Sequence, residues 1–93
     1  MYDENNIFAK IIRKEIPCEI IYEDNKVLFF KDINPQAKIH VLGIPKEKVI
    51  NLREFIDIDD KNTLIYFFKK VHEVIKTLGL EKQGYRLITN DGL

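Results

Sequence analysis

DINPQAKIHVLGIP, residues 32–45, joins an acidic residue and a proline-containing turn to an apolar segment that begins at a histidine. Pro35 fixes its own φ and disfavours helix at the residue before it, so the chain is expected to turn here. Asp32 and Asn34 can brace that turn through side-chain bonds to nearby backbone. Residues 39–44 are predicted to form a largely buried strand, which Pro45 ends. This arrangement suits a small-molecule pocket with Asp32 at one lip, His40 at the other and apolar residues between them.

Upstream of this stretch, the sequence predicts a hairpin and a short helix. Residues 19–23 and 27–31 are rich in β-branched and aromatic residues, and the Asp-Asn turn signal between them indicates two antiparallel strands. Nearer the N-terminus, Asn5 or Asn6 can cap a helix that ends at Ile16-Pro17. The apolar residues of that helix share one side, and they are Ile7, Phe8, Ile11 and Ile12.

Downstream, a polar connection leads to a long amphipathic helix. The connection spans residues 46–57 and is expected to hold a helical turn around Leu52 and Phe55. Lys46 and Lys48 could contact a phosphate, but a solvated loop is the favoured interpretation of both. The helix follows from apolar residues at helical spacing, namely Leu64, Phe67, Phe68, Val71, Val74, Ile75 and Leu78. Asp57, Asp59 or Asp60 is expected to cap it, and Gly79 to end it in the left-handed conformation. Its wide apolar face predicts a homodimer through the 60–78 helix. A fourth strand is predicted at residues 85–89.

Composition restricts the class of protein. The 93 residues form one small domain, and 45% of them are apolar, which is enough for a globular core. Fifteen basic residues balance fifteen acidic ones, so no nucleic-acid partner is expected. Cys18 is the only cysteine, which fits a reducing cytoplasm. The N-terminus lacks the apolar region of a signal peptide, and no apolar run approaches the roughly 20 residues of a membrane span. We therefore expect a soluble, cytoplasmic domain that does not interact with membranes.

Three segments of the chain together resemble the Hint branch of the histidine triad (HIT) family. They are IFAKIIRKEIPCEIIYED (7–24), VLFFKDINPQAKIHVLGIPK (27–46) and LGLEKQGYRLITNDG (78–92). The pattern D-I-x-P-x-A-x-x-H-x-L-x-I-P, spanning residues 32–45, is specific to that family. The resemblance implies an α+β, HIT-like antiparallel sheet with one long helix and a short N-terminal helix. About four strands are expected here, with the family's last strand missing.

The resemblance also implies nucleotide chemistry. HIT proteins bind a purine nucleoside monophosphate group and hydrolyse or transfer it, and Hint members typically cleave phosphoramidates. By this match, Asp32 would accept hydrogen bonds from the ribose hydroxyls, Asn90 would contact the phosphate or a triad histidine, and His40 would support the site without being the nucleophile. The purine would lie against apolar side chains, namely Phe8, Ile11, Ile16, Phe30 and Ile33. Without the resemblance, these residues are a turn brace, a structural histidine and ordinary core.

The chain departs from the family pattern at the nucleophile. The family uses a histidine of an H-x-H-x-H strand, which forms a nucleotidyl-histidine, whereas His40 and His72 are the only histidines here. We therefore expect a single, C-terminally truncated domain over residues 1–93, inactive as written. Asn6 and Ala9 stand about where some relatives carry zinc-binding cysteines, so no metal and no other cofactor is expected. Three hypotheses stay open: part of a nucleotide hydrolase or phosphoramidase, a non-catalytic nucleotide-binding module, and a structural dimeric remnant.

Overall fold

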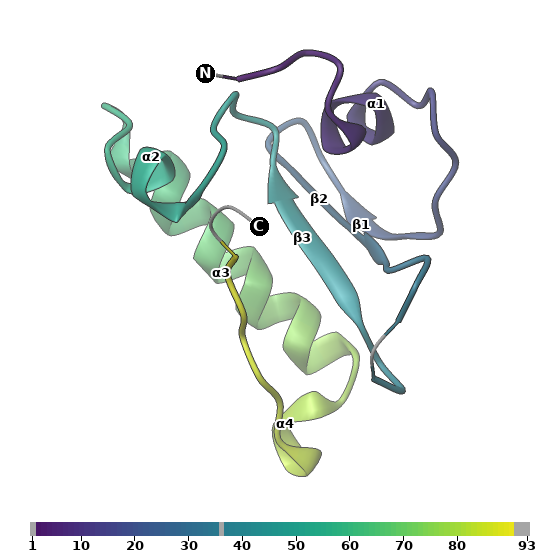
Figure 1. The fold of residues 1–93 in the computed structure, drawn as a ribbon. Helices are drawn as coiled ribbons and strands as arrows, with labels where there is room; N and C mark the ends of the chain where they lie inside the picture. The colour runs from purple at the N-terminus through teal and green to yellow at the C-terminus, as the bar shows by residue number, and fades with distance from the viewer. Residues whose placement is uncertain (1, 36, 91–93) are drawn as a thin grey trace. The chain divides into compact units, whose positions relative to one another are not determined.

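The computed structural model describes residues 2–35 and 37–90, which divide into two compact units on either side of the Lys46–Glu47 peptide bond. The first unit holds one helix and a three-stranded antiparallel sheet of order β1-β2-β3 (Figure 1). Its elements are α1 (Ile7–Ile12), β1 (Ile20–Glu23), β2 (Val27–Lys31) and β3 (Val41–Pro45). The described part of the second unit is helical, with α2 (Leu52–Ile56), α3 (Lys61–Thr77) and α4 (Leu80–Gln83).

The central strand β2 forms the core of the first unit. Its residues from Val27 to Phe30 are all buried, so both faces of the strand are covered. Ile11 of α1 packs with Leu28 and Phe30, which holds the helix against one face of the sheet. Asn6 caps α1, because its side-chain oxygen accepts a hydrogen bond from the backbone N–H of Ala9 at 2.8 Å. The predicted short helix and its cap at Asn6 are confirmed, but the helix ends at Ile12 and not at Ile16-Pro17, because Lys14 adopts a φ of 66°, outside the right-handed helical region.

The turn between β1 and β2 is held by a single aspartate. The carboxylate of Asp24 accepts hydrogen bonds from the backbone N–H groups of Lys26 and Val27, at 2.8 and 3.0 Å. The backbone N–H of Asp24 donates to the carbonyl of Val27 at 3.1 Å. These bonds close the hairpin that the Asp-Asn signal predicts.

The helices of the second unit begin and end largely as the sequence indicates. Asp60 caps α3 by accepting a hydrogen bond from the backbone N–H of Asn62 at 3.0 Å, and Gly79 follows the helix with a φ of 71°. The rings of Phe55 in α2 and Phe67 in α3 meet edge to face, with centroids 5.3 Å apart. The short helix α4 is not predicted by the sequence analysis.

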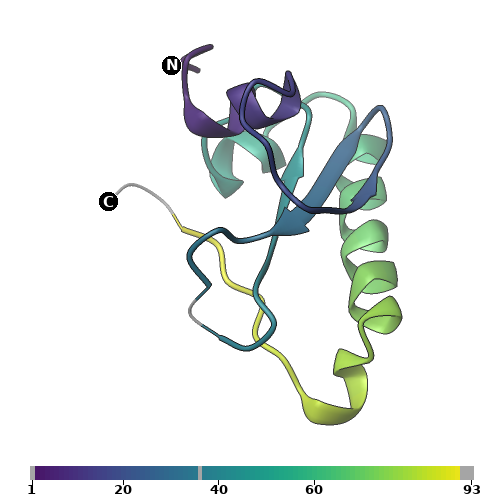
Figure 2. The same cartoon turned by 90° about the vertical axis from the view of Figure 1, so that its right-hand side faces the viewer.

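The predicted fourth strand is wrong. Residues 84–90 continue from α4 as irregular, exposed chain (Figure 2), and the side chain of Ile88 is 69% exposed. A strand needs a neighbour for its backbone hydrogen bonds, and the described part of the second unit offers only helices. The β propensity of residues 85–89 is therefore not realised within this unit. The turn predicted at Asn90-Asp91-Gly92 lies outside the described residues from Asp91 onward.

The predicted third strand needs two smaller corrections. It begins at Val41, not at residue 39, because β2 ends at Lys31, whose partner in the ladder is Val41. It is also half-buried, not largely buried, since it is the edge strand of the described sheet. Among the described residues, no helix is both long and apolar enough to cross a membrane.

Candidate functional site

Asp32 and His40 face each other at the two ends of the connection between β2 and β3. The backbone N–H of Asp32 donates a hydrogen bond to the carbonyl of His40 at 3.0 Å. His40 Nε2 lies 3.4 Å from Asp32 Oδ2, so the two side chains form an ion pair whenever the imidazole is protonated. The prediction that they occupy opposite lips of a pocket, separated by apolar residues, is therefore wrong.

The carboxylate of Asp32 also braces the turn that follows it, as predicted. Its Oδ1 atom accepts a hydrogen bond from the backbone N–H of Asn34 at 3.0 Å. The two carboxylate oxygens therefore contact different partners, one in the turn and one on the far side of the connection. The side chain of Asp32 remains 22% exposed and that of His40 30% exposed. A ligand can thus reach this pair from solvent.

Three of the apolar residues predicted to contact a purine lie in one cluster. Ile11 and Phe30 are buried in the core, and Ile16 packs against them. Phe30 belongs to this cluster, and Asp32 follows it by two residues in the sequence. Phe8 and Ile33 are 43% and 62% exposed, which makes them the two members of the predicted set most accessible to a ligand. The role of all five in binding stays a prediction.

Asn90, the remaining predicted site residue, belongs to the second unit and is exposed. His72 also belongs to the second unit and lies on α3. Across residues 2–35 and 37–90, no group of three or more histidine, cysteine, aspartate or glutamate side chains is arranged to hold a metal ion. Cys18 packs against the apolar core of the first unit.

Glu23 forms an ionic cluster near the end of the β2–β3 ladder that lies opposite Asp32 and His40. Its carboxylate accepts hydrogen bonds from the ammonium groups of Lys14 and Lys46, at 2.5 and 2.7 Å. These bonds, chiefly the one from Lys14, hold the pKa of Glu23 below its usual value. Lys46 is only 21% exposed, so its predicted place in a solvated loop is wrong. Its partner lies far away in the sequence, and no local pattern signals the pairing.

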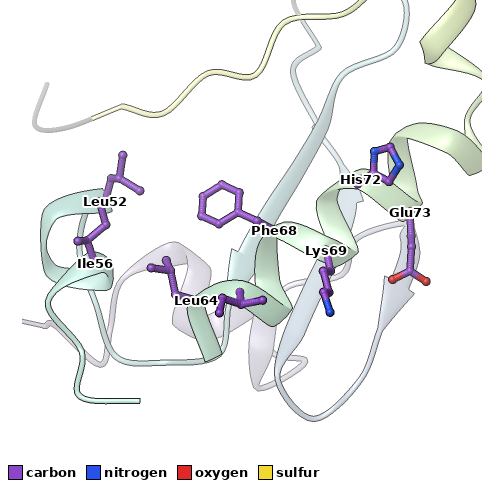
Figure 3. A pocket seen from close by; sticks show the side chains of 8 residues that line it. Leu52, Ile56, Leu64, Phe68, Lys69, His72 and Glu73 are labelled. Atoms are coloured by element: carbon purple, nitrogen blue, oxygen red, sulfur yellow. The ribbon is translucent and has the colours of Figure 1, made fainter. Parts of the chain in front are cut away.

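The second unit carries an open apolar groove of about 870 Å³ along α2 and α3 (Figure 3). Most of its walls are apolar, and Lys69, His72 and Glu73 line one end. The apolar lining residues are Leu52, Ile56, Leu64, Ile65 and Phe68. Ile65 is 53% exposed and Phe68 40% exposed, so this face of α3 remains open to solvent. It lies on the wide apolar face that the helical periodicity predicts.

Comparison with known proteins places these features in a family. A family model described as the scavenger mRNA decapping enzyme C-terminal binding domain matches residues 5–89. A HIT-like protein of Rickettsia prowazekii is 48% identical over 92 residues, which cover 99% of this chain and 77% of the relative. Among solved structures, a HIT family hydrolase from Clostridium thermocellum is 48% identical, with a TM-score of 0.85, and the match covers 97% of this chain and 77% of that one.

A second solved structure, a histidine triad protein from Clostridium difficile, agrees with these matches. It is 37% identical, has a TM-score of 0.81, and is matched over 100% of this chain and 80% of its own. These likenesses cover the α1 helix, the antiparallel sheet and the long α3 helix, which are the elements that the sequence resemblance implies. The chain therefore belongs to the HIT family and has its α+β fold.

Proposed function

We propose that this chain is a nucleotide-binding protein of the Hint branch, and that Asp32 accepts hydrogen bonds from the ribose hydroxyls of a purine nucleoside monophosphate or phosphoramidate. The observation that carries the proposal is the position of the Asp32 carboxylate, which is partly exposed, bonded to the turn that follows it and two residues beyond Phe30 of the apolar cluster. A carboxylate can accept two hydrogen bonds from a vicinal diol, and apolar side chains suit a purine ring. Membership of a hydrolase family supports this assignment.

The proposed activity of the 93-residue polypeptide is binding without turnover. HIT enzymes transfer the nucleotidyl group to a histidine of an H-x-H-x-H strand, and this pattern does not occur in the sequence. His40 is proposed to support the site, since its imidazole lies against Asp32 and not in a histidine cluster. In a HIT enzyme that also supplied the histidine strand, the same residues would hold the nucleoside while phosphoramidate or phosphate-ester cleavage took place.

Titration of the purified chain with adenosine and guanosine monophosphates tests this proposal. Asp32→Asn keeps the size of the side chain but removes its charge, and a hydrogen bond to a charged group contributes about 1.5–3 kcal/mol. We therefore expect Asp32→Asn to weaken binding by at least about tenfold. Asp59→Asn, an exposed aspartate between α2 and α3, is the matched control and should bind as the wild type does. Failure of both nucleotides to bind the wild type, or equal affinity of Asp32→Asn, would contradict the proposal.

A second candidate function, self-association, is favoured by the open groove of the second unit. The groove combines several exposed apolar side chains on one helix face, and contiguous apolar surface of this kind commonly marks a protein interface. The proposed partner is a second copy of this chain, bound through α3 in a homodimer. This function is compatible with nucleotide binding, because Asp32 is not one of the residues that line the groove.

A further inference from the structure

The two oxygens of the Asp32 carboxylate face two different partners. Oδ1 accepts the backbone N–H of Asn34 at 3.0 Å, and Oδ2 lies 3.4 Å from Nε2 of His40. A carboxylate offers about four lone-pair sites, two on each oxygen. Each oxygen therefore has one of these protein partners and a second lone-pair site, which can accept a hydrogen bond from a ligand. The 22% exposure of the side chain gives these remaining sites access to solvent.

The imidazole of His40 is not needed to close the connection between β2 and β3. The backbone N–H of Asp32 already donates to the backbone carbonyl of His40 at 3.0 Å, and this bond uses no side-chain atom. The turn beyond Asp32 is braced by Asn34, again without the imidazole. The imidazole lies 3.4 Å from the carboxylate, so it is placed to affect the orientation of that group.

We infer that His40 is a positioning residue, which orients the Asp32 carboxylate to accept both hydroxyls of a ribose and so makes the site prefer ribonucleotides to 2′-deoxyribonucleotides. The inference rests on the proposed contact of Asp32 with ribose. A ribose presents two neighbouring donors, one for each carboxylate oxygen, whereas a 2′-deoxyribose presents only one. If Oδ2 loses its partner, the Asp32 carboxylate rotates more freely. Binding of both ribose hydroxyls then has to order the Asp32 side chain as well. The ribonucleotide then loses more affinity than the deoxyribonucleotide.

Two substitutions separate this role from a general structural one. In His40→Gln, the side-chain amide nitrogen reaches the place of Nε2, whereas in His40→Asn the shorter side chain does not. Binding of AMP and dAMP, and of GMP and dGMP, is measured for the wild type and both variants by calorimetry. We expect His40→Asn to lower the ratio of ribonucleotide to deoxyribonucleotide affinity by about two- to tenfold, the usual effect of leaving one side chain to be ordered on binding. His40→Gln should keep most of that ratio.

The outcomes distinguish the inference from the function on which it rests. A wild type that prefers ribonucleotides, and a His40→Asn variant with the same preference, would overturn the role of His40 while leaving the nucleotide site intact. If the wild type binds none of the four nucleotides, the proposed function fails, and the inference fails with it. A loss of affinity that is equal for ribo- and deoxyribonucleotides would indicate a structural role only and would also overturn the inference.

A measurement without nucleotide keeps the inference testable if His40→Asn does not fold. At a fixed pH, the imidazole nitrogen resonances of both histidines are recorded by NMR in the wild type and in Asp32→Asn. The signals of His40 should move, because the charge beside Nε2 is removed. Unchanged His40 signals would show that the pair is absent in solution and would overturn the inference.

Discussion

Replacing Gly43 with alanine is expected to destabilise the sheet because an aromatic ring lies where the new methyl group must go. Gly43 of β3 pairs with Phe29 of β2. A Cβ atom built on Gly43 would stand 2.5 Å from Cε1 and 2.7 Å from Cδ1 of the Phe29 ring, well inside ordinary van der Waals contact. Phe29 is 3% exposed, so its ring cannot swing into solvent to make room. The substitution therefore forces the ring or the strand to shift.

The expected magnitude is the difference between two opposing effects. Forcing an extra methyl group into a packed core costs about 1–3 kcal/mol. Replacing glycine within a strand recovers about 0.5–1 kcal/mol, because alanine loses less conformational entropy on folding. The difference spans about 0–2.5 kcal/mol, and the approach of 2.5 Å to the ring places the expected net loss in the free energy of unfolding in the upper half of that range. For a domain of this size, each kcal/mol lowers the melting temperature by about 4–8 °C, which calorimetry or circular dichroism can measure readily.

A double-mutant cycle tests whether the ring is the cause. In the Phe29→Leu background the ring is gone, so Gly43→Ala should cost much less than in the wild type. Gly79→Ala is the control: its Cβ would meet no atom within 4 Å, but its φ of 71° strains any side chain. It should therefore be destabilising to the same extent in both backgrounds. A wild-type stability for Gly43→Ala, or an equal cost with and without the ring, would refute the reasoning.

Three further predictions concern a cap, an ionic cluster and the groove. Asp60→Ala should lower the free energy of unfolding by about 1 kcal/mol in urea titrations, because α3 loses its N-cap, while Asp59→Ala should change it by less than about 0.5 kcal/mol. The lowered pKa of Glu23 means that its ionic stabilisation is complete above the unfolded-state pKa of about 4.3 and is lost as the pH falls through the lower folded-state value. Glu23→Gln should thus lose less stability than the wild type between pH 7 and pH 3; equal losses would contradict this. Wild-type chain at micromolar concentration should scatter light as a dimer and Phe68→Asp as a monomer, and a monomeric wild type would rule out the proposed homodimer.

Local signals in the sequence predict much of the fold because their physical cause is local. The caps at Asn6 and Asp60 and the turn at Asp24 each depend on a side chain that bonds backbone two or three residues away, so the sequence window contains both partners. The pairing of Glu23 with Lys46 depends instead on strand register. The strand predicted at residues 85–89 needs a neighbour that its own unit does not provide. Both errors arise where the deciding partner is distant in sequence.

The contact between Asp32 and His40 is neither fully local nor distant in sequence, because it joins the two ends of one connection. The register of the β2–β3 hairpin determines it. Along the β2–β3 ladder, each step forward on one strand is one step back on the other, and Lys31 with Val41 is the last pair. The next residues outward are Asp32 and His40, so an unbroken ladder brings these two together. The spacing between the acidic residue and the histidine in the family pattern therefore has a geometric meaning: it is the length of connection that lets the ends of β2 and β3 meet with these side chains in contact. The register that begins with Val27 and Pro45 therefore places His40 against the carboxylate, and not across a pocket from it.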